Sequence, residues 1–262
     1  MSIELKEIIQ KLQELAPLQY QESYDNSGLL IGNVNSFISS AVVCLDCTEE
    51  VIDEAIAQGA NLVIAHHPLI FSGLKKITGD NYVERTVIKA IKNDVAVYAI
   101  HTNLDNVPNG VNAKITELMG ILNAKILSPK KGLANVGSGM IGELKEEMAA
   151  LDFFKKIKSS FDVAMLRHTV VLKDKVKRIA VCGGSGSFLL QEAIEQGADV
   201  FVSSDFKYHQ FFDAENQIVI VDIGHYEAEK FTKELIYDFL REKFPTFVVR
   251  LSNIKTNPVN YL

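Results

Sequence analysis

The chain repeats part of its own sequence after 138 residues, and this repeat limits its possible folds more than any other feature. The run from Glu54 to Ala60 reads E-A-I-A-Q-G-A, and the run from Glu192 to Ala198 reads E-A-I-E-Q-G-A. In each copy an apolar, strand-like segment precedes a helix that ends at glycine, and another apolar segment follows. Two copies at so long a period exclude a solenoid. We therefore predict an α/β protein with two related α/β domains built from a duplicated βαβ unit.

The same patterns predict the domain limits. We expect domain 1 over residues 1–126 and domain 2 over 127–239, with segment 240–262 packing back on domain 1. Residues 127–174 contain Pro129 and a Lys130-Lys131-Gly132 turn, so they are expected to form a connector with a small structured part. Apolar periodicity and caps predict helices and strands at the following places: helices over 3–15, 48–57, 82–92 and 225–237, and strands over 40–46, 62–65 and 95–100.

Composition excludes several classes of protein. Of 262 residues, 47% are hydrophobic and 23% are charged, which is typical of a globular domain. No apolar run approaches the roughly 20 residues of a membrane-spanning helix. A net charge of −6 gives no sign of nucleic-acid binding. The start M-S-I-E-L-K-E lacks the order of a secretory signal, and three cysteines make a disulfide framework improbable. We expect a cytoplasmic protein that binds neither membranes nor nucleic acid.

Histidines follow the predicted strands. His66 and His67 come directly after strand 62–65, His101 follows strand 95–100, and His225 follows the apolar run 218–224. Ligands of open parallel sheets bind beyond the carboxyl ends of the strands, which is where these side chains are expected. Any one of them, taken alone, is more typical of a hydrogen-bonded structural histidine.

Two carboxylates share a spacing with these histidines. Asp105 follows His101 by four residues, and Glu229 follows His225 by four residues. On the predicted helix His225 and Glu229 share one face, whereas Pro108 favours a loop around Asp105. Asp105 could instead be a turn former and Glu229 a solvated surface residue.

Taken together, these residues favour metal binding over the separate structural interpretations. The ligand candidates are His66, His67, Asp105, His225 and Glu229, with His101 as an additional ligand or supporting residue. Imidazole and carboxylate together suit zinc, manganese, iron or nickel. Five ligands exceed the needs of one tetrahedral ion, so we expect two divalent metal ions per chain.

Other motifs in the sequence indicate function less strongly than the metal-ligand candidates do. The turn Gly183-Gly184-Ser185-Gly186-Ser187 could bind a phosphate through backbone N–H groups, or could simply be a tight turn. Cys44 and Cys47 have redox spacing, but Cys44 lies within a predicted strand, which favours a packed side chain. His168 is expected to be structural. The candidate substrate contacts are Asp25, Asn26, Gly184, Ser185 and His209.

Several motifs of the chain resemble those of the Nif-three-like family, whose members are often named GTP cyclohydrolase I type 2 homologues. The matching motifs are Y-D-N-S-G-L at 24–29, A-H-H-P-L-I-F at 65–71, H-T-N-L-D at 101–105, G-G-S-G-S at 183–187, D-F-K-Y-H at 205–209 and D-I-G-H-Y-E-A-E at 222–229. The resemblance implies two α/β domains, a dinuclear metal site in the cleft between them, and a ring-shaped homohexamer. It also implies His66, His67, Asp105, His225 and Glu229 as metal ligands.

The chain departs from the family pattern in two places. Longer members carry an inserted domain for which segment 127–174 is too short, so this chain resembles a short form. Many relatives have T-G-D or T-G-E where this chain has Ser203-Ser204-Asp205, which alters the expected loop.

Two functions follow from these interpretations. The first is a metal-dependent hydrolase acting on a nucleotide-like or pterin-like small molecule. The second is a non-catalytic metal-binding ring with a regulatory, metal-handling or partner-binding role. The lack of a G-x-S-x-G nucleophile motif keeps the second interpretation open.

Overall fold

The protein forms two compact units in a computed structural model that describes residues 2–262. The first unit runs to Leu104 and resumes over Thr232–Pro258, and the second comprises Asp105–Phe231 and Val259–Leu262. The first unit change lies at residue 104, before the expected limit at 126, because helix α5 (Val111–Met119) packs on strands of the second unit. The second lies at residue 231, before the expected limit at 239, because helix α9 (Thr232–Lys243) packs on strands of the first unit. Within residues 2–262, no helix combines the length and the apolar character that crossing a membrane requires.

A five-stranded sheet forms the centre of the first unit. Its order is β13-β4-β5-β6-β2, and all neighbours are parallel except the edge strand β2, which runs antiparallel to β6. The strands of the unit are β1 (Ile3–Glu4), β2 (Gly28–Ile31), β3 (Phe37–Ile38), β4 (Ser40–Cys44), β5 (Leu62–Ala65), β6 (Ala96–Ala99) and β13 (Val248–Leu251). The short strands β1 and β3 pair with each other.

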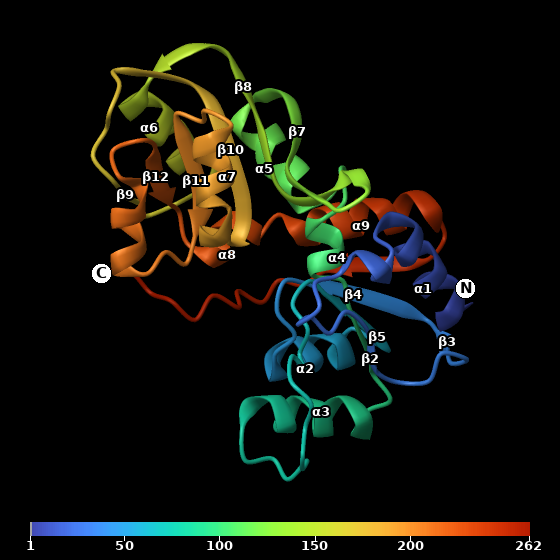
Figure 1. The fold of residues 1–262 in the computed structure, drawn as a ribbon. Helices are drawn as coiled ribbons and strands as arrows, with labels where there is room; N and C mark the ends of the chain where they lie inside the picture. The colour runs from blue at the N-terminus through green and yellow to red at the C-terminus, as the bar shows by residue number, and fades with distance from the viewer. Residues whose placement is uncertain (1) are drawn as a thin grey trace. The chain divides into compact units, whose positions relative to one another are not determined.

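Helices cover both faces of this sheet. The helical segments that begin in this unit are α1 (Leu5–Leu15), η1 (Leu18–Tyr20), α2 (Glu49–Ala57), α3 (Tyr82–Lys92), α4 (Thr102–Asp105) and α9 (Thr232–Lys243), and of these α2, α3 and α9 contact the strands of the sheet. One core cluster joins Val42, Val63 and Val97 to apolar residues of α2 and α3. Because side chains alternate along a strand, the neighbouring residues face the other side, where α1 and α9 lie (Figure 1). This double cover explains why β4, β5 and β6 are buried throughout.

A six-stranded sheet forms the centre of the second unit, in the order β7-β8-β10-β11-β12-β9. Strands β10, β11 and β12 are parallel, and β7, β8 and β9 add antiparallel neighbours. The elements not yet given are β7 (Ile121–Lys130), β8 (Leu133–Ala149), α6 (Ala150–Phe161), β9 (Arg167–His168), β10 (Lys175–Ser185), η2 (Ser187–Leu189), α7 (Leu190–Glu195), β11 (Val200–Ser204), η3 (Tyr208–Ala214), β12 (Val219–Asp222) and α8 (His225–Glu229).

The duplicated βαβ unit is confirmed, and the two copies even share a strand register. In the first copy, β4-α2-β5, Ala41 lies opposite Leu62. In the second copy, β10-α7-β11, Ile179 lies opposite Val200. Each residue of the second pair is the residue of the first moved by 138 positions. The repeat therefore preserves how the first strand pairs with the next, which determines where the polar residues after each strand lie.

The predicted connector at 127–174 is wrong, because most of it forms regular secondary structure: the end of β7, all of β8, helix α6 and strand β9. Strands β7 and β8 form a long hairpin that closes at Gly132, whose φ is +79°. The glycines of β8 are places of close approach: a Cβ on Gly137 would lie 2.1 Å from the carbonyl oxygen of Ser128. The glycine-rich stretch is thus a tightly paired strand, a role that composition does not distinguish from a linker.

Candidate functional site

Three imidazoles cluster at the carboxyl ends of β5 and β6. After β5 the chain continues along β4, since the N–H of His66 donates to Cys44 O at 3.2 Å and that of His67 to Leu45 O at 3.0 Å. The ring centroids of His66 and His67 lie 4.9 Å apart, and His101 lies 5.3 and 5.4 Å from them. One ring nitrogen from each of the three histidines falls within 4.8 Å of the others. The first unit therefore contains a group of three nitrogens that could bind a metal ion.

Hydrogen bonds orient the first two of these rings. His66 is fully buried, and its Nδ1 donates to the carbonyl oxygen of Ile100 at 2.8 Å. His67 is partly exposed, and its Nδ1 lies 2.7 Å from Oδ1 of Asp46. A carbonyl or a carboxylate can only accept, so Nδ1 must carry the proton in both rings. Nε2 is then the nitrogen that carries the lone pair with which each ring could bind a metal, the arrangement usual in metal-ligating histidines.

His101 is oriented in the same way by Asp25, whose side chain is fully buried. Its Nδ1 lies 2.8 Å from Oδ1 of Asp25. The carboxylate also accepts from the N–H and hydroxyl of Thr102 and from the hydroxyl of Ser27. Burial opposes the charged carboxylate, but the contact with His101 and these hydrogen bonds outweigh it and lower the pKa of Asp25 far below its usual range. Asp25, a candidate substrate contact, therefore holds His101 in place.

His225 and Glu229 share one face of α8 in the second unit, as their spacing predicts. His225 Nε2 lies 2.9 Å from Glu229 Oε2, and His225 Nδ1 lies 2.7 Å from Oδ2 of Asp205. Burial disfavours the imidazolium, but the charge of Glu229 and the hydrogen bonds to both carboxylates raise the pKa of His225 to about 11. The predicted helix over 225–237 divides here into α8 and α9.

The glycines at the carboxyl end of β10 make room for Glu229. A Cβ on Gly184 would lie 2.5 Å from Glu229 Oε1, and one on Gly183 would lie 3.5 Å from the same atom. Gly184 also has a φ of +60°, a conformation that L side chains rarely adopt. Glu229 itself is only 2% exposed. Gly184, a candidate phosphate contact, therefore lies against a buried carboxylate.

Asp105 ends the helical turn α4, where a loop was expected from Pro108. That expectation is wrong because Pro108 lies three residues beyond Asp105, after the turn has ended. The side-chain amide of Asn112 donates to the carbonyl oxygen of Asp105 at 3.1 Å, and its Oδ1 accepts from Gly183 N at 2.9 Å. Asn112 thus links Asp105 to the glycine turn beside Glu229.

The sulfur atoms near these groups are buried thiols. Burial and the charges of Asp105 and Glu229 raise the pKa of the Cys182 thiol well above its usual range. Burial likewise raises the pKa of Cys44, and it raises that of Cys47 to about 12. All three are free and protonated at neutral pH, which agrees with the packed role expected for Cys44.

Ser203-Ser204-Asp205, where many relatives have T-G-D or T-G-E, is held by hydrogen bonds. Ser204 ends β11, and its hydroxyl donates to Gly184 O at 2.5 Å, while that of Ser203 donates to the same oxygen at 3.1 Å. The left-handed conformation falls on Asp205, with φ of +58°, rather than on Ser204. A serine in place of glycine at 204 therefore adds no backbone strain.

The other candidate substrate contacts lie in different surroundings. The side-chain amide of Asn26 donates to the carbonyl oxygen of Ile70 at 2.6 Å. Ser185 is exposed at the end of β10. His209 is exposed on η3 and stacks against Tyr208 and Phe212.

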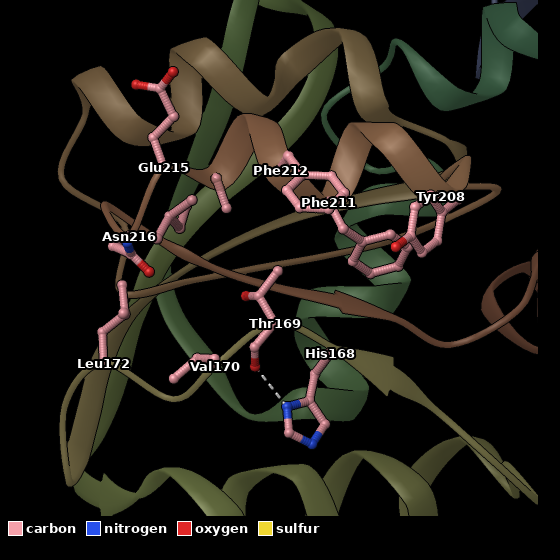
Figure 2. A pocket seen from close by; sticks show the side chains of 11 residues that line it. His168, Thr169, Val170, Leu172, Tyr208, Phe211, Phe212, Glu215 and Asn216 are labelled. Carbon is pink, nitrogen blue, oxygen red and sulfur yellow. Dashed lines mark hydrogen bonds between the residues drawn. The ribbon is translucent and has the colours of Figure 1, made fainter.

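A separate cavity of about 500 Å³ lies between η3 and the segment after β9 (Figure 2). Tyr208, Phe211 and Phe212 line it from η3, and none of the five ligand candidates does. His168 lies at its edge, with Nδ1 donating to the carbonyl oxygen of Thr169 at 2.7 Å. His168 is thus exposed, with a local hydrogen bond of its own.

Sequence reasoning missed three residues that hold the candidate ligands. Asp46 and Asp205 each follow the end of a parallel strand, and Asn112 lies in α5. The rule that located the histidines, polar residues just beyond strand ends, would have found both aspartates. Asn112 carries no such signal.

Known proteins resemble the chain over nearly its whole length. The model of the family Duf34/NIF3 (NGG1p interacting factor 3) matches residues 3–258. A Clostridium perfringens protein named GTP cyclohydrolase 1 type 2 homolog is 38% identical over 228 residues, 87% of each chain. A Campylobacter jejuni protein of the same name is 36% identical over 260 residues, 99% of this chain and 100% of the relative.

Solved structures agree with this comparison. The crystal structure of a Bacillus cereus protein related to NIF3 matches with a TM-score of 0.93 and 29% identity, covering 100% of this chain and 99% of that one. The crystal structure of a Staphylococcus aureus hypothetical protein matches with a TM-score of 0.90 and 30% identity, covering 100% of both chains. Sequence motifs, repeated topology and these matches lead to one conclusion: the chain belongs to the DUF34/NIF3 family.

Proposed function

We propose that this chain binds two divalent metal ions and uses them to hydrolyse a nucleotide-like or pterin-like small molecule. The proposed ligands are His66, His67, Asp105, His225 and Glu229, with His101 as a supporting residue or additional ligand.

The observation that carries this proposal is the shared orientation of the strand-end imidazoles. In His66, His67, His101 and His225, Nδ1 lies within 2.8 Å of an oxygen that can only accept. Each such bond fixes the ring and makes Nε2 the nitrogen with which the ring would bind a metal. In His225, Nε2 lies 2.9 Å from Glu229 Oε2, so a metal ion there would replace the proton shared by this pair. His168 also donates from Nδ1 to a carbonyl oxygen, but that oxygen belongs to the next residue, Thr169. In the four strand-end histidines the accepting oxygen comes from a residue at least 20 positions away.

The donor set also fits the proposed ions. Imidazole nitrogens and carboxylate oxygens together suit zinc, manganese, iron or nickel, whereas calcium and magnesium prefer oxygen alone. Such ions lower the pKa of bound water and stabilise negative charge that develops on a substrate oxygen. The protein's own contribution is orientation: Asp46, Asp25 and Asp205 hold three rings, and the glycine turn holds Glu229.

One observation supports the substrate class: several relatives carry the name GTP cyclohydrolase 1 type 2 homolog, and GTP is a nucleotide. Asn26, Ser185 and His209 remain the proposed substrate contacts, whereas Asp25 and Gly184 already contact His101 and Glu229.

The test is a screen of purified, metal-loaded protein against GTP, other nucleotides and phosphoesters. We expect turnover that a chelator abolishes and that His66→Ala abolishes, while His168→Ala retains it. Binding of two ions without turnover on any of these substrates would favour the non-catalytic metal-binding ring. Failure to bind any ion would overturn both functions.

Assembly is part of the same proposal. The family resemblance implies a homohexameric ring, so light scattering of the purified protein should give a mass six times that of the 29.1 kDa chain. A monomer at micromolar concentration would contradict the hexameric ring. It would not affect the metal-binding proposal, which the screen above tests separately.

A further inference from the structure

The segment after β13 is attached to the first unit by side-chain hydrogen bonds, and we call residues 252–258 the C-terminal strap. Ser252 N donates to Val43 O at 2.8 Å, which continues the pairing of β13 with β4. The hydroxyl of Ser252 then donates to Glu54 Oε2 at 2.5 Å, and Asn253 N donates to Glu54 Oε1 at 2.9 Å. Glu54 opens the repeated E-A-I-x-Q-G-A run and lies on α2. One carboxylate thus fixes the start of the strap.

The strap reaches the histidine cluster through Thr256. The hydroxyl of Thr256 donates to Asp46 Oδ2 at 2.5 Å, and the other oxygen of the same carboxylate, Oδ1, lies 2.7 Å from His67 Nδ1. Between these contacts, Ile254 packs against the apolar core of the unit. The strap is therefore held at both ends, and its far end touches the residue that orients His67.

We propose that Thr256 is a positioning residue that sets the direction of His67 through Asp46, a role that rests on the proposed metal function. The Asp46 side chain is 35% exposed, so water competes for its oxygens. A carboxylate on a single χ2 torsion can rotate unless both oxygens are occupied. Thr256 fixes one oxygen, and the other is then directed at His67 Nδ1. Nε2 of His67, on the opposite side of the ring, acquires a fixed direction as a result.

The size of the effect follows from how such supporting groups behave. Loss of a residue that hydrogen-bonds a metal-ligating histidine typically costs about 10–100-fold in metal affinity. Asp46→Asn removes that direct support, and we expect a loss in this range. Thr256→Val keeps the shape but removes the hydroxyl, and we expect a loss of about 10-fold, the lower end of the range.

The experiment measures zinc affinity by competition with a chromophoric chelator for the wild-type protein and four variants. Thr256→Val and Asp46→Asn should weaken one of the two zinc ions, and Thr256→Ser, which keeps the hydroxyl, should restore wild-type affinity. The matched control is Thr86→Val, since the buried Thr86 hydroxyl bonds only the helix carbonyl of Tyr82, at 2.7 Å. It should leave zinc affinity unchanged.

A second measurement on metal-free protein separates this inference from the proposed function. Nitrogen NMR of the imidazoles should show His67 with its proton held on Nδ1 in the wild type and in Thr256→Ser. In Thr256→Val the two tautomers should exchange. If the wild type binds no zinc, the proposed function fails, and this spectrum still decides the role of Thr256. If Thr256→Val matches the wild type in both measurements, the inference is wrong.

Discussion

Four histidines follow strands in this chain, and in each of them an oxygen within hydrogen-bond distance of Nδ1 fixes the orientation of the ring. For His66 that oxygen is a backbone carbonyl, and for His67, His101 and His225 it is an aspartate carboxylate. An aspartate partner raises the basicity of the opposite nitrogen as well as fixing the ring. The chemistry at this scale is therefore determined by pairs of residues rather than by single histidines.

The two acidic ligand candidates should behave differently when neutralised. Glu229 Oε2 lies beside His225 while Oε1 lies beside the glycine turn, so its two oxygens point to different neighbours. We expect Glu229 to bridge the two ions, because an anion between two cations offsets their repulsion. Glu229→Gln should therefore weaken both ions in a metal titration. Asp105→Asn should weaken mainly one, and retention of one wild-type ion by Glu229→Gln would contradict the bridge.

A buried carboxylate away from the ligand candidates should make stability depend on pH. Glu84 Oε2 accepts from the N–H groups of Thr78, Gly79 and Asp80, and from the hydroxyl of Thr78. The backbone hydrogen bonds from Thr78 and Asp80 lower the pKa of Glu84 to about 2 against the usual 4.5. Because the pKa is lower in the folded state, ionised Glu84 stabilises that state fully at pH values above 4.5. This contribution is lost as the pH falls toward 2.

Glu84→Gln tests this contribution. The variant should unfold at lower urea concentration than the wild type at pH 7, because its side chain carries no charge and has an NH2 group in place of one of the two accepting oxygens. The difference should shrink between pH 4.5 and pH 2. A difference that stays constant over this range would show that charge on Glu84 is not what stabilises the loop 78–81.

At the scale of elements, the connection between a strand and the next helix positions the candidate ligands. Strand β10 contacts α8, and Gly183 and Gly184 at its carboxyl end let the carboxylate of Glu229 approach the backbone. In the other copy of the repeat, β4 ends at Cys44 and is followed by Asp46, which orients His67. The duplicated unit therefore supports the histidines differently in its two copies.

Two glycine substitutions, one at the end of β10 and one after α7, separate backbone strain from steric contact. Gly184 and Gly197 both have left-handed φ, +60° and +71°, but only a Cβ on Gly184 meets other atoms within 4 Å. Gly197→Ala should destabilise the protein by about 1–2 kcal/mol, the cost of this conformation for an L residue, and should leave metal affinity intact. Gly184→Ala should cost more in urea unfolding and should weaken metal binding because it displaces Glu229. Equal effects of the two variants on metal affinity would contradict this role of Gly184.

At the scale of the whole molecule, two sheets with the same central topology form two cores. Val42, Val63 and Val97 belong to the first core, and Ala180, Phe201 and Ile220 occupy the corresponding strands of the second. Both sheets also have an antiparallel edge strand: β2 pairs with β6 in the first sheet, and β9 pairs with β12 in the second. Each unit contains proposed ligands of its own: His66 is one in the first unit, and Glu229 is one in the second.

Metal removal should therefore lower the stability of the whole chain. A ligand that binds only the folded state stabilises it by about 2.7 kcal/mol at a concentration 100 times its Kd. The melting temperature should rise on addition of zinc or manganese and fall again with chelator. His66→Ala and Glu229→Gln should each lose most of this rise, whereas His168→Ala should keep it. A chelator-insensitive melting temperature in metal-loaded wild type would contradict the prediction.

The sequence alone determined features that depend on near neighbours along the chain. Helix 82–92 was predicted with the bounds of α3, because its caps and apolar spacing are local. His225 and Glu229 were placed on one helical face by their four-residue spacing. The strand-end position of the histidines and the duplicated βαβ unit likewise follow from short patterns, since strand and helix periods act over a few residues.

The tertiary structure decided which distant residues meet. Asp46 orients His67 from 21 residues away, Asp25 orients His101 from 76 residues away, and Thr256 reaches Asp46 across 210 residues. No periodicity encodes such pairs, because they form only when parallel strands bring their ends to one edge of a sheet. The glycine-rich run in β8 was misread for the same reason: its close approach to β7 exists only once the two strands have paired.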